Sequence, residues 1–264
     1  MDRKAIFLKA RRKAYMKNIE VCSMRDKAIS EIFEAAKAED RNFLYEHEAK
    51  KLFALFDMPV TKIHVAETED DAVEAAERIG YPIVLKIVSP QILHKSDAGG
   101  VKVNLKTEDD VKTAFDEIMA NAKKYGEKKG IDVDLSRGVF ISQFADVGTE
   151  VIIGVTRDPQ FGHAIMFGLG GIFVEVLKDV TFRLIPFTET DAREMVSEIK
   201  AAKILDGVRG QAPRDVDALV QVMMGVSKMV SENPEISELD CNPTFVYDKG
   251  KGALVVDARI IIEK

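Results

Sequence analysis

The chain has 264 residues, of which 46% are hydrophobic and 31% charged, and its formal net charge at pH 7 is -6. This composition is typical of a globular protein, and the length allows a core to be buried in one large domain or two lobes. The acidic balance argues against nucleic-acid binding, and no apolar run approaches the roughly 18 to 20 residues that span a membrane.

The N-terminal segment is the basic part of the sequence. Residues 1–27 carry nine Lys or Arg residues against three acidic ones. Apolar residues spaced for one helical face predict a helix here: Ile6, Phe7, Ala10 and Ala14. An organelle-targeting peptide is compatible with the charge, but the few serines and the three acids favour a solvated or partner-binding helix. We therefore treat residues 1–42 as a helical N-terminal extension.

Helix and strand patterns alternate along the rest of the chain. Apolar spacing predicts helices at 28–38, 45–56, about 190–203 and 214–231. Strand patterns occur at 82–88, 100–105, 139–144, 150–157, 163–167, 172–177, 180–187, 236–241, 244–248 and 253–262. Three Thr-x-x-Asp patterns are predicted helix N-caps: Thr68/Asp71, Thr107/Asp110 and Thr188/Asp191. The alternation predicts an α/β (α+β) protein.

A polar segment divides this pattern into two parts. Lys123 to Arg137 is polar and contains Gly126, Gly130 and Ser136, so it is the predicted hinge. The expected organisation is a small lobe over 43–137 and a strand-rich large lobe over 138–264. A cleft between lobes is a common place for a ligand site.

The segment from Tyr81 to Val103, YPIVLKIVSPQILHKSDAGGVKV, places a lysine inside an apolar strand. Alternation puts Lys86 on one face of that strand with Val84 and Val88. A buried ammonium requires an anionic partner, and phosphate is a natural one. The alternative is a lysine at a strand edge that buries only its aliphatic stem.

Glycines follow this strand and recur later in the chain. Gly99 and Gly100 are predicted to let the backbone approach an anion and to offer it N–H groups, although such a pair is usually only a turn. The glycines at 168, 170 and 171 do not form a dinucleotide fingerprint, and the sequence contains no Walker A motif. A classical mononucleotide-binding fold is therefore disfavoured.

Acidic and amide side chains near the C-terminus predict a magnesium site. Alternation places Glu238, Asp240 and Asn242 on one strand face, and Asp257 follows the apolar pair Val255-Val256 after a short hairpin. Oxygen ligands from neighbouring strands suit magnesium that bridges carboxylates to nucleotide phosphates. A solvated hairpin with its charges outward is the alternative.

The histidines and cysteines differ in their expected roles. His94 lies between the lysine-bearing strand and the glycine pair, where an imidazole nitrogen can act as a nucleophile toward phosphorus. We expect His47 and His64 to be structural, and His163 has no identifiable partner in the sequence. The two cysteines, at 22 and 241, match no metal or redox spacing and fit reduced thiols in the cytoplasm.

Taken together, these motifs resemble the ATP-grasp β subunit of ADP-forming acyl-CoA synthetases (acetate–CoA ligase, ADP-forming). The resemblance runs from about Phe43 to Ile262 and rests on the Tyr81 to Val103 segment and on SQFADVGTEVIIGVTRDPQFG, MFGLGGIFVEVLKDVTFRLIPF, LDGVRG, ELDCNP and VVDARI. A weaker similarity to the succinyl-CoA synthetase β subunit appears in AGGVKV and the acid-x-Asn-Pro element. The resemblance implies a two-lobed ATP-grasp fold.

The resemblance also implies roles for individual residues. Lys86 is expected at the nucleotide phosphates, and Gly99 and Gly100 are kept as nucleotide-binding candidates. Residues Gln143, Phe144 and Ala145 are expected at the adenine, with Glu150 at the ribose hydroxyls. Asn242 and Asp257 match magnesium-binding positions. Asp240 is expected to orient a phosphohistidine, and His94 matches the histidine that relays phosphate.

The implied reaction converts acyl-CoA, ADP and phosphate into acid, ATP and CoA, reversibly, with ATP/ADP and Mg²⁺ as bound species. An α subunit that carries the CoA-binding domain and a phosphorylatable histidine is the implied partner, in an α2β2 assembly. Two alternatives remain open: another ATP-grasp carboxylate ligase, including a succinyl-CoA synthetase-like subunit, and a non-catalytic nucleotide-sensing subunit. Neither nucleic acid nor membrane is an expected partner, and the expected location is cytoplasmic.

Overall fold

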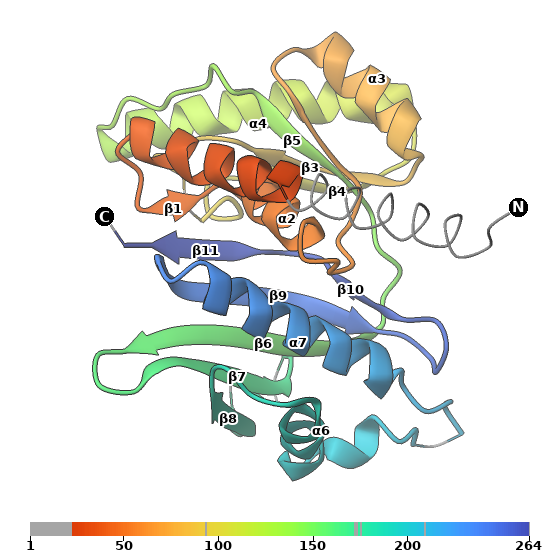
Figure 1. Cartoon of the computed structure of the whole chain (residues 1–264). Helices are drawn as coiled ribbons and strands as arrows, with labels where there is room; N and C mark the ends of the chain where they lie inside the picture. The colour runs from red at the N-terminus through yellow and green to blue at the C-terminus, as the bar shows by residue number, and fades with distance from the viewer. Residues whose placement is uncertain (1–22, 93, 172–173, 175, 209, 264) are drawn as a thin grey trace, which may run out of the picture.

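Two antiparallel sheets organise the chain in the computed structural model, which describes residues 23–92, 94–171, 174, 176–208 and 210–263 (Figure 1). The smaller sheet has the strand order β2-β5-β3-β4. Its strands are β2 (Ile63–Ala66), β3 (Ile83–Ile87), β4 (Val101–Leu105) and β5 (Val139–Gln143). Helices α3 (Glu69–Ile79) and α4 (Glu108–Lys129) pack on one face of it.

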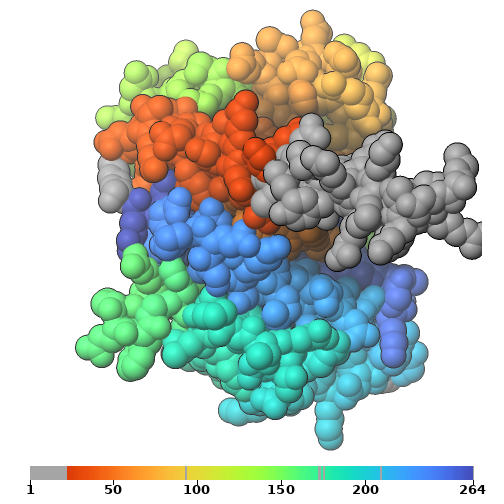
Figure 2. Space-filling view, viewed as in Figure 1, coloured from red at the N-terminus to blue at the C-terminus, as the bar shows by residue number. Residues whose placement is uncertain are grey.

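The larger sheet has the order β1-β11-β9-β6-β7-β8, with β10 beside β9. Its strands are β1 (Phe43–Leu44), β6 (Thr149–Asp158), β7 (Gly162–Leu169), β8 (Val180–Leu184), β9 (Ile236–Val246), β10 (Ala253–Val255) and β11 (Arg259–Ile262). Its helices are α2 (Glu46–Ala54), α6 (Glu189–Glu198), the 3-10 turn η1 (Ala202–Ile204) and α7 (Val216–Glu232). Figure 2 shows the red and orange N-terminal residues directly above the blue α7 on one face.

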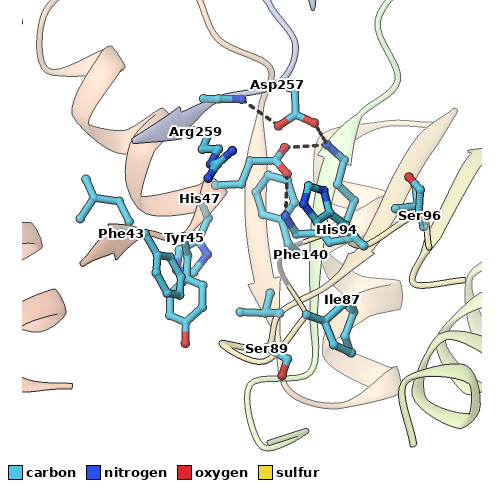
Figure 3. A pocket seen from close by; sticks show the side chains of 18 of the residues that line it. Phe43, Tyr45, His47, Ile87, Ser89, His94, Ser96, Phe140, Asp257 and Arg259 are labelled. Atoms are coloured by element: carbon cyan, nitrogen blue, oxygen red, sulfur yellow. Dashed lines mark hydrogen bonds and ion pairs between the residues drawn. The ribbon is translucent and has the colours of Figure 1, made fainter. Parts of the chain in front are cut away.

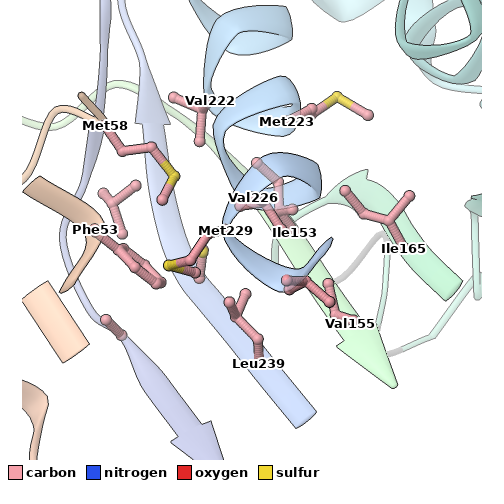
Figure 4. Close-up of a cluster of buried hydrophobic side chains, with 14 of the residues drawn as sticks. Phe53, Met58, Ile153, Val155, Ile165, Val222, Met223, Val226, Met229 and Leu239 are labelled. Atoms are coloured by element: carbon pink, nitrogen blue, oxygen red, sulfur yellow. The ribbon is translucent and has the colours of Figure 1, made fainter. Parts of the chain in front are cut away.

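The core of the large lobe lies between its helices and one face of the larger sheet. Figure 4 shows Phe53, Met58 and Met229 meeting strand residues such as Ile153 and Leu239, and all of these side chains are buried. Burying one such side chain contributes about 1.5–3 kcal/mol. Residues 23–38 are helical, and the apolar face of this helix packs into the core through Ile29, Phe33 and Ala36. Residues 1–22, and with them most of the predicted extension, lie outside the described ranges.

Strand β3 of the smaller sheet is packed on both of its faces. Ile83, Leu85 and Ile87 pack with residues of α3 and α4 in one cluster. The opposite face carries Val88 and Phe140, which pack with Tyr45 at the start of α2. The alternation predicted for the lysine-bearing strand is thereby confirmed, and the lysine lies on the face turned toward α2.

All three predicted helix caps are confirmed. Thr68, Thr107 and Thr188 each accept a hydrogen bond from the backbone N–H three residues on, at Asp71, Asp110 and Asp191. These caps begin α3, α4 and α6. The polar pairs are therefore structural.

The chain crosses between the sheets at a different place from the predicted hinge. Helix α4 continues through Lys129 and ends at Gly130, which has a left-handed φ of 67°. Gly126 is helical, and a Cβ there would lie 2.7 Å from Val133 Cγ2, so glycine allows the following segment to pack closely. The chain then returns to the smaller sheet as β5, between β2 and β3, and crosses to β6 only after Gln143.

Sheet membership also differs from a division at residues 137 and 138. Strand β1 pairs with β11 of the larger sheet, with Phe43 opposite Ile261 and Leu44 opposite Ile260. These positions are distant in sequence, and strand pairing between them is not encoded in local composition. The polar residues of the predicted hinge indicate that this segment is exposed to solvent. They do not indicate which sheet the following strand joins.

Four predicted strands are realised differently, and one of them, 253–262, forms the two strands β10 and β11. The run at 172–177 forms no strand where the structure describes it, since 174 is helical and 176 and 177 are in a turn with Val176 and Leu177 exposed. The predicted strands at 236–241 and 244–248 form one strand, β9. A register shift opposite Val151 and Ile153 accommodates Pro243, which cannot donate to the ladder.

Candidate functional site

Lys86 is held between two carboxylates from different parts of the chain. Its Nζ lies 2.7 Å from Glu46 Oε1 and 3.0 Å from Asp257 Oδ2, and its side chain is 12% exposed (Figure 3). Burial by itself lowers the pKa of Lys86, but the two carboxylates outweigh it and raise the pKa. The lysine is therefore a fixed positive charge at neutral pH, as the strand pattern predicts.

Asp257 brings the larger sheet to this lysine. It lies between β10 and β11, and its Oδ1 accepts a hydrogen bond from the Ala258 N–H at 2.8 Å. The remaining oxygen, Oδ2, is the one that contacts Lys86. Lys86 of the smaller sheet and Asp257 of the C-terminal segment therefore lie in direct contact.

Glu46 is the centre of a buried group of charges. Its side chain is 3% exposed and contacts Lys50 Nζ at 3.0 Å, while Lys95 Nζ lies 3.7 Å from Oε2. Lys50 is fully buried and donates to Thr61 Oγ1 at 2.9 Å. Burial alone raises the pKa of Glu46, but the surrounding lysines lower it to about 2. This carboxylate is ionised across the physiological range.

A cavity of about 550 Å³ opens beside these charges. It is lined from both lobes and from α2, and its lining includes five of the residues predicted for the site: Lys86, His94, Asp240, Asn242 and Asp257. His94 is exposed at the cavity, and its imidazole makes no hydrogen bond to another described residue. A cavity of this size suits a small ligand with polar groups.

Asp240 presents an acceptor with no protein partner. Its Oδ1 is buried and has no hydrogen bond within the described part of the chain. Burial and the nearby Asp257 raise the pKa of Asp240, and Arg259, which pairs with it across β9 and β11, opposes this rise. The strand alternation is confirmed, because Leu239 and Cys241 are buried on the other face.

The oxygen atoms around this cavity fit a magnesium ion. Asn242 and Asp257 line the same cavity, and Asp240 adds the buried, unpaired carboxylate oxygen. The described residues contain no cluster of three or more His, Cys, Asp or Glu side chains suited to a metal. Magnesium is usually held by one or two carboxylates together with substrate phosphates and water, so this smaller donor set is sufficient.

The two glycines of the loop do not have the free N–H groups that the sequence predicts. The Gly99 N–H donates to Ser96 O at 3.0 Å, and the Gly100 N–H donates to Lys95 O at 2.8 Å. A Cβ on Gly100 would lie 2.5 Å from Ile87 Cγ2. The glycines therefore form a tight turn against β3, and neither lines the cavity.

The residues expected at the adenine and ribose lie between the end of β5, which contains Gln143, and the start of β6, which contains Glu150. The Gln143 N–H donates to Lys62 O, and the Phe144 N–H donates to Pro82 O, so this connection is fixed to the smaller lobe. Ala145 is buried. Glu150 is exposed beside Gly170, whose N–H donates to the Glu150 carbonyl at 2.8 Å. None of these four predicted residues lines the cavity next to Lys86.

The other histidines have structural contacts. The His47 ring stacks on Tyr45, and burial followed by nearby positive charges lowers its pKa to about 3. His64 Nε2 lies 3.2 Å from Asp71, and His163 Nε2 lies 2.6 Å from the Ile236 carbonyl oxygen. The last contact supplies the partner that the sequence did not reveal.

Sequence reasoning missed Glu46, Lys50 and Lys95. One signal was available, because Glu46, Ala49, Lys50 and Phe53 follow the i, i+3, i+4, i+7 spacing of a buried helix face. Charged residues at two of these positions indicate an ion pair in the core. Nothing local indicates that Lys95 lies beside the same carboxylate.

Comparisons with known proteins show the family and the fold of this chain. A protein-family model described as an ATP-grasp domain matches residues 35–262. The chain is 52% identical over 233 residues to the β subunit of acetate–CoA ligase [ADP-forming] II of Pyrococcus furiosus, covering 88% of this chain and 97% of that subunit.

Solved structures of one archaeal enzyme share the fold. Candidatus Korarchaeum cryptofilum dinucleotide forming acetyl-coenzyme A synthetase 1, in complex with coenzyme A, Ca-AMPCP and HgCl+, matches with a TM-score of 0.82 and 46% identity, over 88% of this chain and 99% of that one. A second structure of that enzyme holds coenzyme A and Mg-AMPPCP, with its phosphohistidine segment pointing towards the nucleotide binding site. It matches with a TM-score of 0.77 and 44% identity, over 89% of this chain and 100% of that one.

Proposed function

This chain belongs to the ATP-grasp family, and we propose that it is the nucleotide-binding β subunit of an ADP-forming acyl-CoA synthetase of the acetate–CoA type. The observation that carries this proposal is the meeting of Lys86 with Asp257 beside a cavity that also contains His94. The similarity of this chain to an acetate–CoA ligase [ADP-forming] β subunit, over nearly the whole length of that subunit, supports the reaction class. The enzyme is an acid–thiol ligase that acts together with an α subunit.

The chemical step of this subunit is phosphoryl transfer between a phosphohistidine and ADP. An oxygen of the ADP β-phosphate forms a new bond to phosphorus, and the phosphorus–nitrogen bond breaks with its electron pair returning to the imidazole. The overall reaction converts acyl-CoA, ADP and phosphate into acid, ATP and CoA, reversibly. Such a step depends mainly on positioning and on neutralising the phosphoryl charge.

Lys86 supplies fixed positive charge for the nucleotide phosphates. Its stem is buried, so binding an anion requires little further desolvation, and its pKa keeps it protonated. A preorganised charge in a poorly solvated site stabilises developing negative charge more strongly than the same charge in water. We assign Lys86 to the phosphates on this basis.

His94 and Asp240 act at the phosphoryl end of the site. His94 is exposed at the cavity and is available to accept a phosphoryl group or to contact one. The unpaired Oδ1 of Asp240 is available to accept a hydrogen bond from an incoming imidazole N–H. That contact would fix the ring orientation of the phosphohistidine.

Asn242 and Asp257 would hold a magnesium ion. When bound, the ion neutralises nucleotide phosphate oxygens and fixes their orientation. Asp257 then serves two partners, because its Oδ2 already contacts Lys86.

The segment that connects the two sheets is proposed to bind the adenine and ribose of the nucleotide. Gln143, Phe144 and Ala145 are proposed to contact the adenine, since the first two are hydrogen-bonded to the smaller lobe and form a fixed edge. Glu150 is proposed to accept hydrogen bonds from the ribose hydroxyls. Gly99 and Gly100 are proposed to act indirectly, by shaping the turn that follows His94.

The α subunit is proposed to carry the CoA-binding domain and the phosphorylatable histidine, in an α2β2 assembly. A location in the cytoplasm belongs to the same proposal, because the buried Cys241 thiol is free and disulfides are uncommon there. As a separate finding, no helix of the described residues is long and apolar enough to cross a membrane.

The test is reconstitution with the α subunit from the same source. The complex is expected to form ATP from acetyl-CoA, ADP and phosphate, whereas neither chain does so alone. ADP binding without any ATP formation, across a panel of acyl-CoA substrates, would contradict the proposal and leave a nucleotide-sensing role. ATP-dependent joining of a carboxylate to an amine by this chain alone would identify a different ligase.

A further inference from the structure

Glu46 occupies a helix position that normally carries an apolar side chain. It lies in the first turn of α2, on the same buried face as Ala49, Lys50 and Phe53. Replacing a buried ion pair by apolar residues of similar size is often neutral or stabilising. Stability therefore does not by itself explain why this face carries charges.

The two oxygens of Glu46 have different surroundings. Oε1 contacts both Lys50 Nζ at 3.0 Å and Lys86 Nζ at 2.7 Å. Oε2 is buried and has no hydrogen bond to the described residues, and Lys95 Nζ lies 3.7 Å from it. Oε1 thus holds the Lys86 ammonium in place, and Oε2 faces Lys95, which is next to His94 in the sequence.

These contacts join three segments that carry the site. Lys86 belongs to β3, Lys95 belongs to the loop that carries His94, and Glu46 belongs to α2. All three residues line the same cavity. The Glu46 carboxylate therefore contacts the two ammonium groups that line the cavity, Lys86 and Lys95. Its third partner, Lys50, is fully buried and does not line the cavity.

We propose that Glu46 is a positioning residue for phosphoryl transfer, because its buried carboxylate sets where the Lys86 and Lys95 ammonium groups stand beside the cavity. This inference rests on the proposed function. A lysine side chain has several rotatable bonds, and a fixed anion restricts it to the orientation that meets the phosphates. The same anion ties the His94 loop to β3.

A purely structural role for Glu46 would act through Lys50. Lys50 is fully buried, donates to Thr61 and lies 5.1 Å from the centre of the Phe140 ring. Removing Glu46 alone would leave this ammonium uncompensated in the core, which is strongly destabilising. Removing both members together avoids that cost and separates the two roles.

The experiment compares Glu46→Gln/Lys50→Met with the wild type and with Lys50→Met, all reconstituted with the α subunit. Measurements are the unfolding temperature, the Kd of ADP for the isolated chain by calorimetry, and kcat and KM for ADP. In the double variant we expect an unfolding temperature near that of the wild type, an at least tenfold lower kcat and a several-fold weaker Kd. Lys50→Met keeps the contacts of Glu46 with Lys86 and Lys95, so we expect kcat within threefold of the wild type.

Wild-type kcat and Kd in the folded double variant would overturn the inference and leave Glu46 a structural role. If the double variant does not fold, a cycle of Glu46→Asp, Lys95→Gln and their combination replaces it. Glu46→Asp keeps the charge at a shorter reach, and coupling of at least threefold in kcat/KM is expected between the two positions. Additive effects would overturn the inference. An inactive wild-type complex would instead reject the proposed function.

Discussion

The Lys86 ammonium lies 3.0 Å from Asp257, although the two residues are 171 positions apart and belong to different lobes. This contact joins β3 of the smaller sheet to the acidic C-terminal part of the larger sheet. It brings a fixed positive charge next to the side chains proposed to bind magnesium. This is where we propose that the nucleotide phosphates bind, because both kinds of partner lie side by side there.

Lys86→Met should nearly abolish phosphoryl transfer. Loss of one preorganised charge at a reacting group typically lowers kcat by roughly 10²–10³-fold. Lys86→Arg should recover only part of the activity, since a planar guanidinium cannot replace a compact ammonium at this site. Steady-state kinetics of the reconstituted complex provides the measurement.

Lys102→Met is a matched control for that substitution. Lys102 lies on the neighbouring strand β4 and pairs with Glu117 outside the cavity. Its kcat should remain within about twofold of the wild type, because exposed ion pairs contribute little. An equal loss of kcat in Lys86→Met and Lys102→Met would show that Lys86 has no specific role in the transfer.

His94→Asn should stop phosphoryl transfer and spare nucleotide binding. The imidazole faces the cavity, whereas the main chain around it is held by the 94–100 turn. Calorimetry should therefore give an ADP Kd within about threefold of the wild type, while ATP formation falls by at least roughly 10²-fold. His64→Asn, which changes a histidine outside the cavity, is the control. Full activity in His94→Asn would exclude His94 from the transfer.

Asp257→Asn should raise the magnesium concentration needed for activity. A neutral amide is a weaker ligand for magnesium than a carboxylate, and it also weakens the contact with Lys86. Titrating magnesium at fixed ADP should shift the half-maximal concentration by at least about tenfold. Asp248→Asn, in the turn between β9 and β10, should leave that concentration unchanged. An unshifted titration in Asp257→Asn would refute the assigned ligand.

Stability should fall in mild acid because of His47. Burial, together with Lys51, Arg41 and Arg137, lowers its pKa to about 3, whereas the ordinary value is 6.5. Between these values the unfolded chain binds a proton that the folded chain does not. The stabilisation is thus complete above pH 6.5 and decreases toward pH 3, by at most about 1.4 kcal/mol per pH unit.

Urea unfolding at pH 7.5, 6 and 5 tests this expectation. The free energy of unfolding should fall more steeply with decreasing pH in the wild type than in His47→Gln, which has no titrating ring. Parallel pH profiles would show that His47 does not stay neutral in the folded protein.

The parts of the site that follow from strand periodicity were predictable from the sequence. Alternation alone placed Lys86 opposite Ile83 and Leu85, and it placed Asp240 and Asn242 on one face of β9. The Thr-x-x-Asp caps were equally local. In each case the structure follows from neighbouring residues alone, either from the two-residue repeat of a strand or from a cap residue and the helix that it begins.

The parts that depend on distant pairing were not predictable. Strand β1 joins the larger sheet because it pairs with β11, at the other end of the chain. A local prediction was also wrong, because the N–H groups of Gly99 and Gly100 donate to carbonyl oxygens of their own turn. Glu46 acquires its partners Lys86 and Lys95 only when α2 packs on β3 and on the 94–100 turn.

The most direct test of the account is histidine labelling. The purified complex of this chain with its α subunit is incubated with magnesium and ATP labelled in the γ-phosphate, then chased with unlabelled ADP. We expect acid-labile, base-stable label on histidine that the chase removes as labelled ATP, and no label when the chain carries Lys86→Met. Absence of labelled histidine in either wild-type chain, under conditions where ATP is bound, would contradict phosphoryl transfer by this site.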